Sequence, residues 1–169
     1  MLLCTARFAI QKNHEFLLDI VNELKKIDSN ICLLLVGKGP LENDIRLKVK
    51  KFALQQEVMF LGARGDVNEL MQAADCFVMP SFCEGLGIVY IEAQAAGLRT
   101  YAAREALVRE ACVTNLIEGI PLSMGANKWA EKIYEQREYK RENQKELIEK
   151  SGFDICTTVE YLEEFYQSK

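Results

Sequence analysis

The sequence predicts one α/β domain with a Rossmann-like, doubly wound parallel sheet and helices on both faces. Short apolar runs alternate with stretches of helical spacing along the 169 residues, as expected for strands joined by crossover helices. Most of these runs are apolar at every position, which is typical of strands buried on both faces. The sequence contains no low-complexity tract, internal repeat or linker, so we expect a single domain over residues 1–169.

The first half of the chain contains four predicted strands and three predicted helices. The strands cover residues 2–6, 31–36, 58–61 and 76–79, and the helices cover residues 14–27, 41–54 and 67–74. Asn13 is placed to cap the first helix. Asp66 and Glu69 form a capping-box pattern at the start of the third helix.

The second half begins with a helix from Ile88 that Gly97 ends. A strand at 100–103, a short helix at 107–111 and an extended piece at 117–122 follow, and helices at 126–139, 141–150 and 155–167 close the chain. Alternating charges over residues 131–150 predict a solvated helical face. We expect four aromatic side chains to be packing residues and not a base-stacking platform: Trp129, Tyr161, Phe165 and Tyr166.

The composition argues against several classes of function. A net charge of −4 and a pI of about 5.2 disfavour general nucleic-acid binding. The six cysteines lack Cys-x-x-Cys spacing and His14 is the only histidine, so neither a zinc site nor a disulfide framework is expected. No apolar stretch approaches the roughly 20 residues that span a membrane. We therefore expect a reduced, cytoplasmic domain, and a strand beginning at Leu2 indicates a piece of a longer chain.

Two cations follow the first predicted strand. Arg7 and Lys12 flank Gln11 just before the helix that begins near Asn13. A pair of cations beside the positive end of a helix suits a diphosphate, because fixed charge and free N–H groups both favour an anion. Two solvated surface cations are the alternative. The position at the carboxyl end of a strand, where ligands of open parallel sheets bind, favours the diphosphate.

The loops after the next two strands contain weaker candidates. Gly37 and Gly39 flank Lys38 and either let a ligand approach the backbone or form a tight turn. Arg64 either contacts a base or points to solvent. Neither loop has a Walker or dinucleotide-binding glycine motif.

The segment from Pro80 to Gly97 contains two glutamates eight positions apart. Glu84 lies in a glycine-flanked loop, where its carboxylate can accept hydrogen bonds from sugar hydroxyls. Glu92 lies on the following helix and is placed for a ribose diol. Solvated carboxylates are the alternative. Because Glu92 stands in an apolar segment, we expect it to be largely buried and to need a partner.

These residues together resemble a known family. The matching segments are Arg7…Gln11-Lys12-Asn13, Val36-Gly37-Lys38-Gly39-Pro40, Phe60-Leu61-Gly62, Pro80-Ser81…Glu84-Gly85-Leu86…Glu92-Ala93 and Gly97. Over essentially the whole chain they look like the donor half of a retaining glycosyltransferase of family 4, which has the two-domain GT-B architecture. Among such enzymes the chain is most similar to bacterial capsular or exopolysaccharide glycosyltransferases.

The resemblance implies a role for each candidate residue. Arg7 and Lys12 would hold the diphosphate of a nucleotide sugar and stabilise charge on the departing nucleotide. Glu84 would contact the donor sugar and Glu92 the ribose. The remaining nucleotide contacts would come from Gly37, Gly39 and Arg64 and from the backbone of Gly85, Leu86, Gly87 and Ile88.

The resemblance also implies partners. The donor would be a UDP-sugar in preference to a GDP-sugar, and no metal ion or other cofactor would be needed. The acceptor would be a polysaccharide or a lipid-linked sugar, bound by an N-terminal domain absent from this chain. The isolated domain would then bind nucleotide weakly and not transfer sugar. The full-length enzyme would be cytoplasmic and could lie at the inner face of the membrane, with the closing helix crossing back to the missing domain.

Two departures from the family pattern and three rival functions stay open. Gly87 stands where the family commonly has proline, and Arg99 stands where Gly-Leu-Pro is usual. A sugar-nucleotide epimerase of the same architecture is one rival, although it needs acid and base residues that we cannot place in this half. A non-catalytic receiver-like module is the second, although it needs acidic residues where Arg7 stands. The third is a degenerate, structural glycosyltransferase domain.

Overall fold

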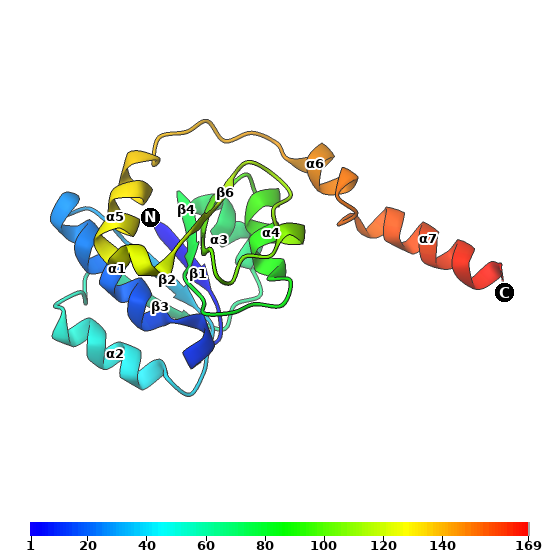
Figure 1. Cartoon of the computed structure of the whole chain (residues 1–169). Coiled ribbons are helices and arrows are strands. Elements are labelled where there is room, and N and C mark those ends of the chain that lie inside the picture. The colour runs from blue at the N-terminus through cyan, green and yellow to red at the C-terminus, as the bar shows by residue number, and fades with distance from the viewer. Residues whose placement is uncertain (169) are drawn as a thin grey trace.

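Six parallel strands form the sheet in the computed structural model, which describes residues 1–168 (Figure 1). The strands are β1 Leu2–Thr5, β2 Leu33–Val36, β3 Val58–Gly62, β4 Cys76–Met79, β5 Arg99–Ala103 and β6 Ile117–Ile120. Their order across the sheet is β3-β2-β1-β4-β5-β6. This order is that of a doubly wound Rossmann-type sheet and confirms the predicted fold class, with the strand order reversing between β1 and β4.

Helices cover both faces of the sheet. They are α1 His14–Ile27, α2 Glu42–Lys51, α3 Val67–Ala73, α4 Ile88–Ala95, α5 Gly125–Glu135, α6 Lys145–Lys150 and α7 Ile155–Gln167. In Figure 1, α1, α2 and α5 lie on one side of the sheet and α3 and α4 on the other. The short helix predicted at 107–111 is only a 3-10 turn at Arg109–Ala111.

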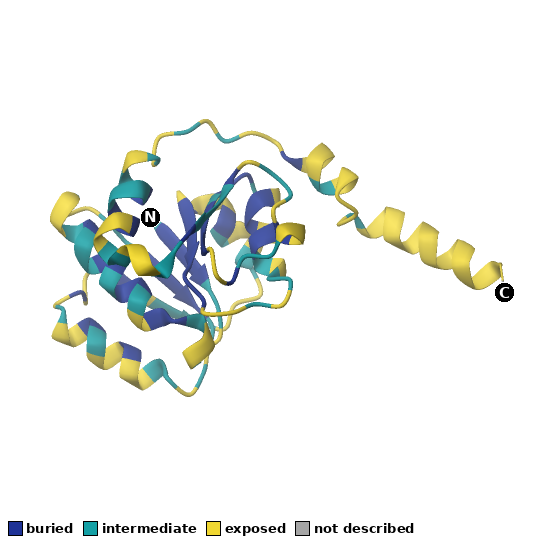
Figure 2. Cartoon of the chain, in the orientation of Figure 1, coloured by how far each residue is buried: buried dark blue, intermediate teal, exposed yellow. Residues whose placement is uncertain are grey.

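The centre of the sheet is buried on both faces, as its apolar runs predict. β2 and β4 are buried at every position, whereas the edge strands β3 and β6 are mostly half-buried. Figure 2 shows the central strands and the inner faces of the flanking helices in dark blue. Leu17 and Val21 of α1 are among the fully buried residues. Trp129 of α5 is also fully buried, and its ring meets that of Phe16 edge-on. These contacts fix α5 against α1.

The helices predicted at 126–139 and 141–150 are shorter than expected, because the chain between α5 and α6 is irregular. This connection crosses the amino ends of β4 and β5. There the Tyr139 hydroxyl accepts a hydrogen bond from the backbone N–H of Arg99 at 2.9 Å, and Arg141 donates to backbone carbonyls at the end of α3. Tertiary contacts have overridden helical propensity at this edge.

The closing helix α7 has the predicted bounds but lies away from the sheet. Figure 1 shows α6 and α7 extending from the body, and Figure 2 shows α7 exposed along its length. Tyr161 and Tyr166 are 65% and 73% exposed, and Phe165 is exposed as well. The expectation of packing is therefore wrong for these three residues and right for Trp129. Within residues 1–168, no helix combines the length and the apolar character needed to cross a membrane.

Candidate functional site

Two loops meet at the carboxyl edge of the sheet, where the strand order reverses. They follow the adjacent strands β1 and β4. Three hydrogen bonds join them: the Asn13 amide donates to the Pro80 carbonyl at 3.1 Å, the Gln11 amide donates to the Cys83 carbonyl at 2.7 Å, and the Phe82 N–H donates to the Gln11 carbonyl at 2.8 Å. Side chains of these two loops are therefore held at fixed positions relative to one another.

The same loops bring Lys12 and Glu84 into contact. The Lys12 Nζ lies 2.7 Å from Glu84 Oε1 and 2.8 Å from Oε2. The two side chains are 21% and 7% exposed, so the pair is largely shielded from water. The residues predicted to contact the diphosphate and the sugar are thus direct neighbours, although 72 positions separate them.

A second cation and two helix ends lie at this edge. Arg7 is exposed and its guanidinium has no ion-pair partner within residues 1–168. The helices α1 and α4 both begin here, at His14 and Ile88, so their unpaired N–H groups add positive potential. The arrangement favours an anion.

Asn13 and His14 follow Lys12 in the chain and help to hold the loop that contains it. Asn13 has a left-handed backbone with φ of 51° and is the N-cap residue of α1, but its side chain makes no capping hydrogen bond, and its amide donates to the Pro80 carbonyl. The predicted N-cap position is therefore confirmed, without a capping hydrogen bond from the side chain. His14 is 3% exposed and its ring centroid lies 4.6 Å from that of Phe8. Burial and the nearby charge of Lys12 lower the pKa of His14 to about 4, so this imidazole is a neutral packing group.

Gly37 and Gly39 let the loop after β2 lie directly on the loop after β1. A Cβ atom on Gly37 would lie 2.1 Å from the Ala6 carbonyl oxygen, and one on Gly39 would lie 2.4 Å from the Phe8 carbonyl oxygen. Close approach is therefore needed within the protein itself. The predicted contact of these glycines with a ligand stays a prediction.

Residues 1–151 match the family of proteins described as glycosyl transferases group 1. The chain belongs to the group 1 glycosyltransferase family. EpsF of Bacillus subtilis, classed by its name as a glycosyltransferase, is 36% identical over 157 residues, which cover 91% of this chain and 41% of EpsF. This group 1 chain therefore spans about two-fifths of the length of that relative.

Solved structures show the same fold. The pneumococcal O-GlcNAc transferase GtfA, in complex with UDP and GlcNAc, superposes with a TM-score of 0.82 at 16% identity, over 99% of this chain and 35% of GtfA. Alr3699/HepE of Anabaena, in complex with UDP and glucose, superposes with a TM-score of 0.79 at 21% identity, over 99% of this chain and 48% of HepE. The group 1 glycosyltransferase chain thus has the Rossmann-like fold of GT-B enzymes.

Glu92 of the group 1 domain is exposed, so the expectation that it is buried is wrong. Its neighbours Ile91 and Ala93 do face the core, and the buried polar residue of α4 is Gln94, whose amide donates to the carbonyls of Tyr90 and Ala111 at 2.9 and 2.7 Å. Helical spacing turns position 92 away from the sheet. It faces a groove of about 500 Å³ between α3 and α4, where Gly65 also lies.

Arg64 lies in the loop that leads into α3, and its guanidinium forms hydrogen bonds within that loop. Its guanidinium donates to both carboxylate oxygens of Asp66, from Nε to Oδ1 at 2.7 Å and from Nη2 to Oδ2. This hydrogen bond holds the pKa of Asp66 below its usual value. Asp66 makes no side-chain cap to α3, so the predicted capping box is wrong. The contact of Arg64 with a base stays a prediction.

The loop after Glu84 leads into α4 through Gly87. Gly87 has a φ of 69°, which proline cannot adopt, and a Cβ atom there would lie 2.6 Å from the Tyr90 ring. A proline at this position would need a different backbone conformation. Gly85 and Ile88 are exposed and Leu86 is half-buried, so this stretch lines the outer surface of the site.

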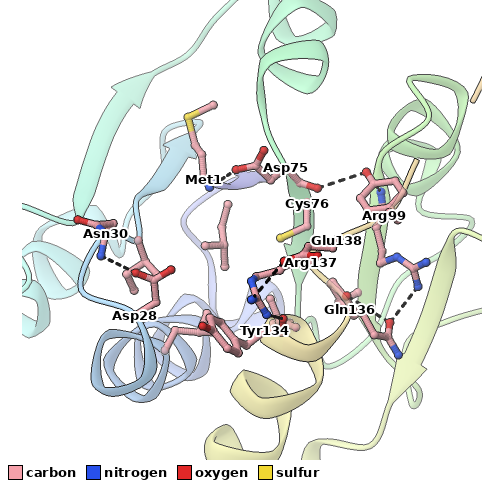
Figure 3. Close-up of a pocket in the computed structure, with 16 residues that line it drawn as sticks. Met1, Asp28, Asn30, Asp75, Cys76, Arg99, Tyr134, Gln136, Arg137 and Glu138 are labelled. Atoms are coloured by element: carbon pink, nitrogen blue, oxygen red, sulfur yellow. Dashed lines mark hydrogen bonds and ion pairs between the residues drawn. The ribbon is translucent and has the colours of Figure 1, made fainter. Parts of the chain in front are cut away.

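A pocket of about 260 Å³ lies at the opposite, amino edge of the sheet (Figure 3). It is formed at the first residues of β1, β4 and β5, and Figure 3 shows Arg99 donating to Gln136, at 2.9 Å. Arg99 therefore supports the α5–α6 connection and belongs to neither loop of the candidate site. Within residues 1–168, no group of three or more His, Cys, Asp or Glu residues is placed to hold a metal ion.

Proposed function

We propose that this chain is the donor-binding domain of a retaining GT-B glycosyltransferase, with the nucleotide diphosphate bound where the loops after β1 and β4 meet. The Lys12–Glu84 contact carries the proposal, because it puts a cation suited to a diphosphate beside a carboxylate suited to a sugar. Ligands of open parallel sheets bind at such a reversal of strand order. The exposed Arg7 and the N-terminus of α4 add positive potential at the same edge.

The proposed chemistry is transfer of a sugar from a nucleotide diphosphate with retention at the anomeric carbon. Arg7 and Lys12 would stabilise the negative charge that develops on the departing diphosphate. Fixed cations and backbone N–H groups at a helix start can do this without a metal ion. Retention and metal independence rest on the resemblance of the motifs to family 4.

The nucleoside would lie along the start of α4 toward α3. Glu92 faces the groove of about 500 Å³ between these helices, so its carboxylate is available to accept hydrogen bonds from two ribose hydroxyls. Gly65 lines the same groove, and Arg64 precedes it in the chain. A base bound there would meet Arg64 once the guanidinium turns from Asp66. Backbone N–H groups of residues 85–88 would contact the phosphates.

The similar proteins support the choice of donor and the need for a second domain. The structures of GtfA and HepE hold UDP, so a UDP-sugar is the favoured donor and a GDP-sugar the second choice. Because the chain spans 41% of EpsF, we propose that an N-terminal domain binds a polysaccharide or lipid-linked acceptor and that α7 returns to it. The complete enzyme would act in the cytoplasm, at the inner face of the membrane where the acceptor is lipid-linked.

Calorimetric titration with UDP, GDP and ADP, and with the matching monophosphates, tests the proposal. We expect measurable binding of one nucleoside diphosphate and weaker binding of its monophosphate. Arg7→Ala and Lys12→Ala should each weaken diphosphate binding by about 1–3 kcal/mol, as expected for charged hydrogen bonds. Lys51→Ala, which removes an exposed cation at the far end of α2, is the matched control. Equal affinity for UDP and UMP, or no binding by a folded sample, would contradict the proposal.

A further inference from the structure

The two cations of the proposed diphosphate site differ in whether a carboxylate of the protein already binds them. Lys12 is shared between both carboxylate oxygens of Glu84, at 2.7 and 2.8 Å, and this leaves one ammonium proton for another acceptor. Arg7 is exposed, and its guanidinium has no ion-pair partner in the described part of the chain. An anion can therefore meet Arg7 directly, but it meets Lys12 only in competition with Glu84.

Release of Lys12 leaves Glu84 in need of a new partner. The Glu84 side chain is only 7% exposed, and a shielded carboxylate without a cation or hydrogen-bond donor is destabilised. A nucleoside diphosphate brings only further negative charge to this place. A nucleotide sugar also brings hydroxyl groups, which can donate hydrogen bonds to the freed carboxylate. The two kinds of ligand therefore differ in whether they offer the Glu84 carboxylate a new hydrogen-bond donor.

We propose that Glu84 makes the site select sugar-bearing nucleotides over free nucleoside diphosphates, by exchanging Lys12 for the sugar hydroxyls. When the sugar leaves, Glu84 loses its hydroxyl partners and competes again with the product diphosphate for Lys12. This competition promotes release of the product. The inference rests on the proposed function and deepens it, since it assigns to Glu84 a role toward Lys12 as well as toward the sugar.

Binding of UDP and of UDP-sugars to Glu84→Gln tests this inference. The amide removes the competing charge, so we expect UDP to bind about fivefold or more tightly than to the unchanged chain, in line with loss of one charged hydrogen-bonded contact. UDP-glucose, UDP-galactose and UDP-GlcNAc should gain nothing or bind more weakly, because the sugar loses its acceptor. Glu84→Ala should change the affinities for UDP and for the UDP-sugars in the same directions. Thermal unfolding of each variant checks that it is folded.

Glu15→Gln is the matched control, because it removes one negative charge from the start of α1 without touching Lys12. It should leave the ratio of UDP to UDP-sugar affinity unchanged. If the folded Glu84 variants bind UDP equally or more weakly than the unchanged chain, this inference is overturned while the proposed function stands. If the unchanged chain binds neither UDP nor GDP, the proposed function fails and the inference fails with it.

Discussion

His14 shows how a single buried residue links the site to the stability of the domain. Its imidazole is the first side chain of α1, packs on Phe8 and lies beneath the loop that contains Lys12. Burial first, and the charge of Lys12 second, lower its pKa from 6.5 to about 4. Protonation of His14 therefore destabilises the folded state and places a second positive charge next to the loop that contains Lys12.

This pKa shift predicts a pH dependence of stability. Between pH 6.5 and about 4 the unfolded chain binds more protons at His14 than the folded chain, so the free energy of unfolding falls as the pH falls. From about pH 7.5 to about pH 5 the loss from this group is about 2 kcal/mol. Urea unfolding at both pH values should show a smaller loss for His14→Phe, which keeps a ring against Phe8. The same loss in both proteins would show that other groups cause it.

At the scale of elements, α7 is separate from the body of the domain. Its residues are exposed from Ile155 onward, and its apolar positions Val159 and Leu162 face solvent. We expect removal of residues 152–169 to change the free energy of unfolding by no more than about 0.5 kcal/mol, as for changes that leave a core untouched. Urea unfolding of the shortened chain measures this. A loss of about 2 kcal/mol or more would mean that α7 stabilises this domain itself.

The elements that the sequence predicts well are those with a strong local pattern. All six strands and the bounds of α1 and α7 follow from apolar runs and helical spacing. The stretch between α5 and α6 could not be predicted, because the bonds of Tyr139 and Arg141 to distant backbone are tertiary. The exposure of α7 could not be predicted either. Its amphipathic pattern shows that one face is apolar, but not which element covers that face.

The sequence predicts which residues form the candidate site better than it predicts the contacts between them. Strand ends and charge placed Lys12 and Glu84 at one edge of the sheet, and the structure brings them together. Spacing alone could not show that they bind each other, nor that Gln11 joins the two loops. The prediction that Glu92 is buried is wrong, because an apolar neighbourhood in the sequence does not say which way one position of a helix points.

At the scale of the whole molecule, the chain contains one complete sheet and one edge suited to a ligand. It belongs to the group 1 glycosyltransferase family and spans only part of the relatives that it matches. The cations, the helix starts and Glu84 lie at the carboxyl edge, whereas the pocket of Figure 3 lies at the opposite edge. The central claim is therefore one of position: the nucleotide binds between the loops after β1 and β4.

Hydrogen–deuterium exchange with and without saturating UDP tests this position most directly. We expect slower backbone exchange in residues 7–13 and 80–88, where the diphosphate would order both loops. Segments 28–31 and 136–139, which line the opposite pocket, serve as an internal control and should not change. Slower exchange confined to those two segments, with residues 7–13 and 80–88 unaffected, would contradict the account.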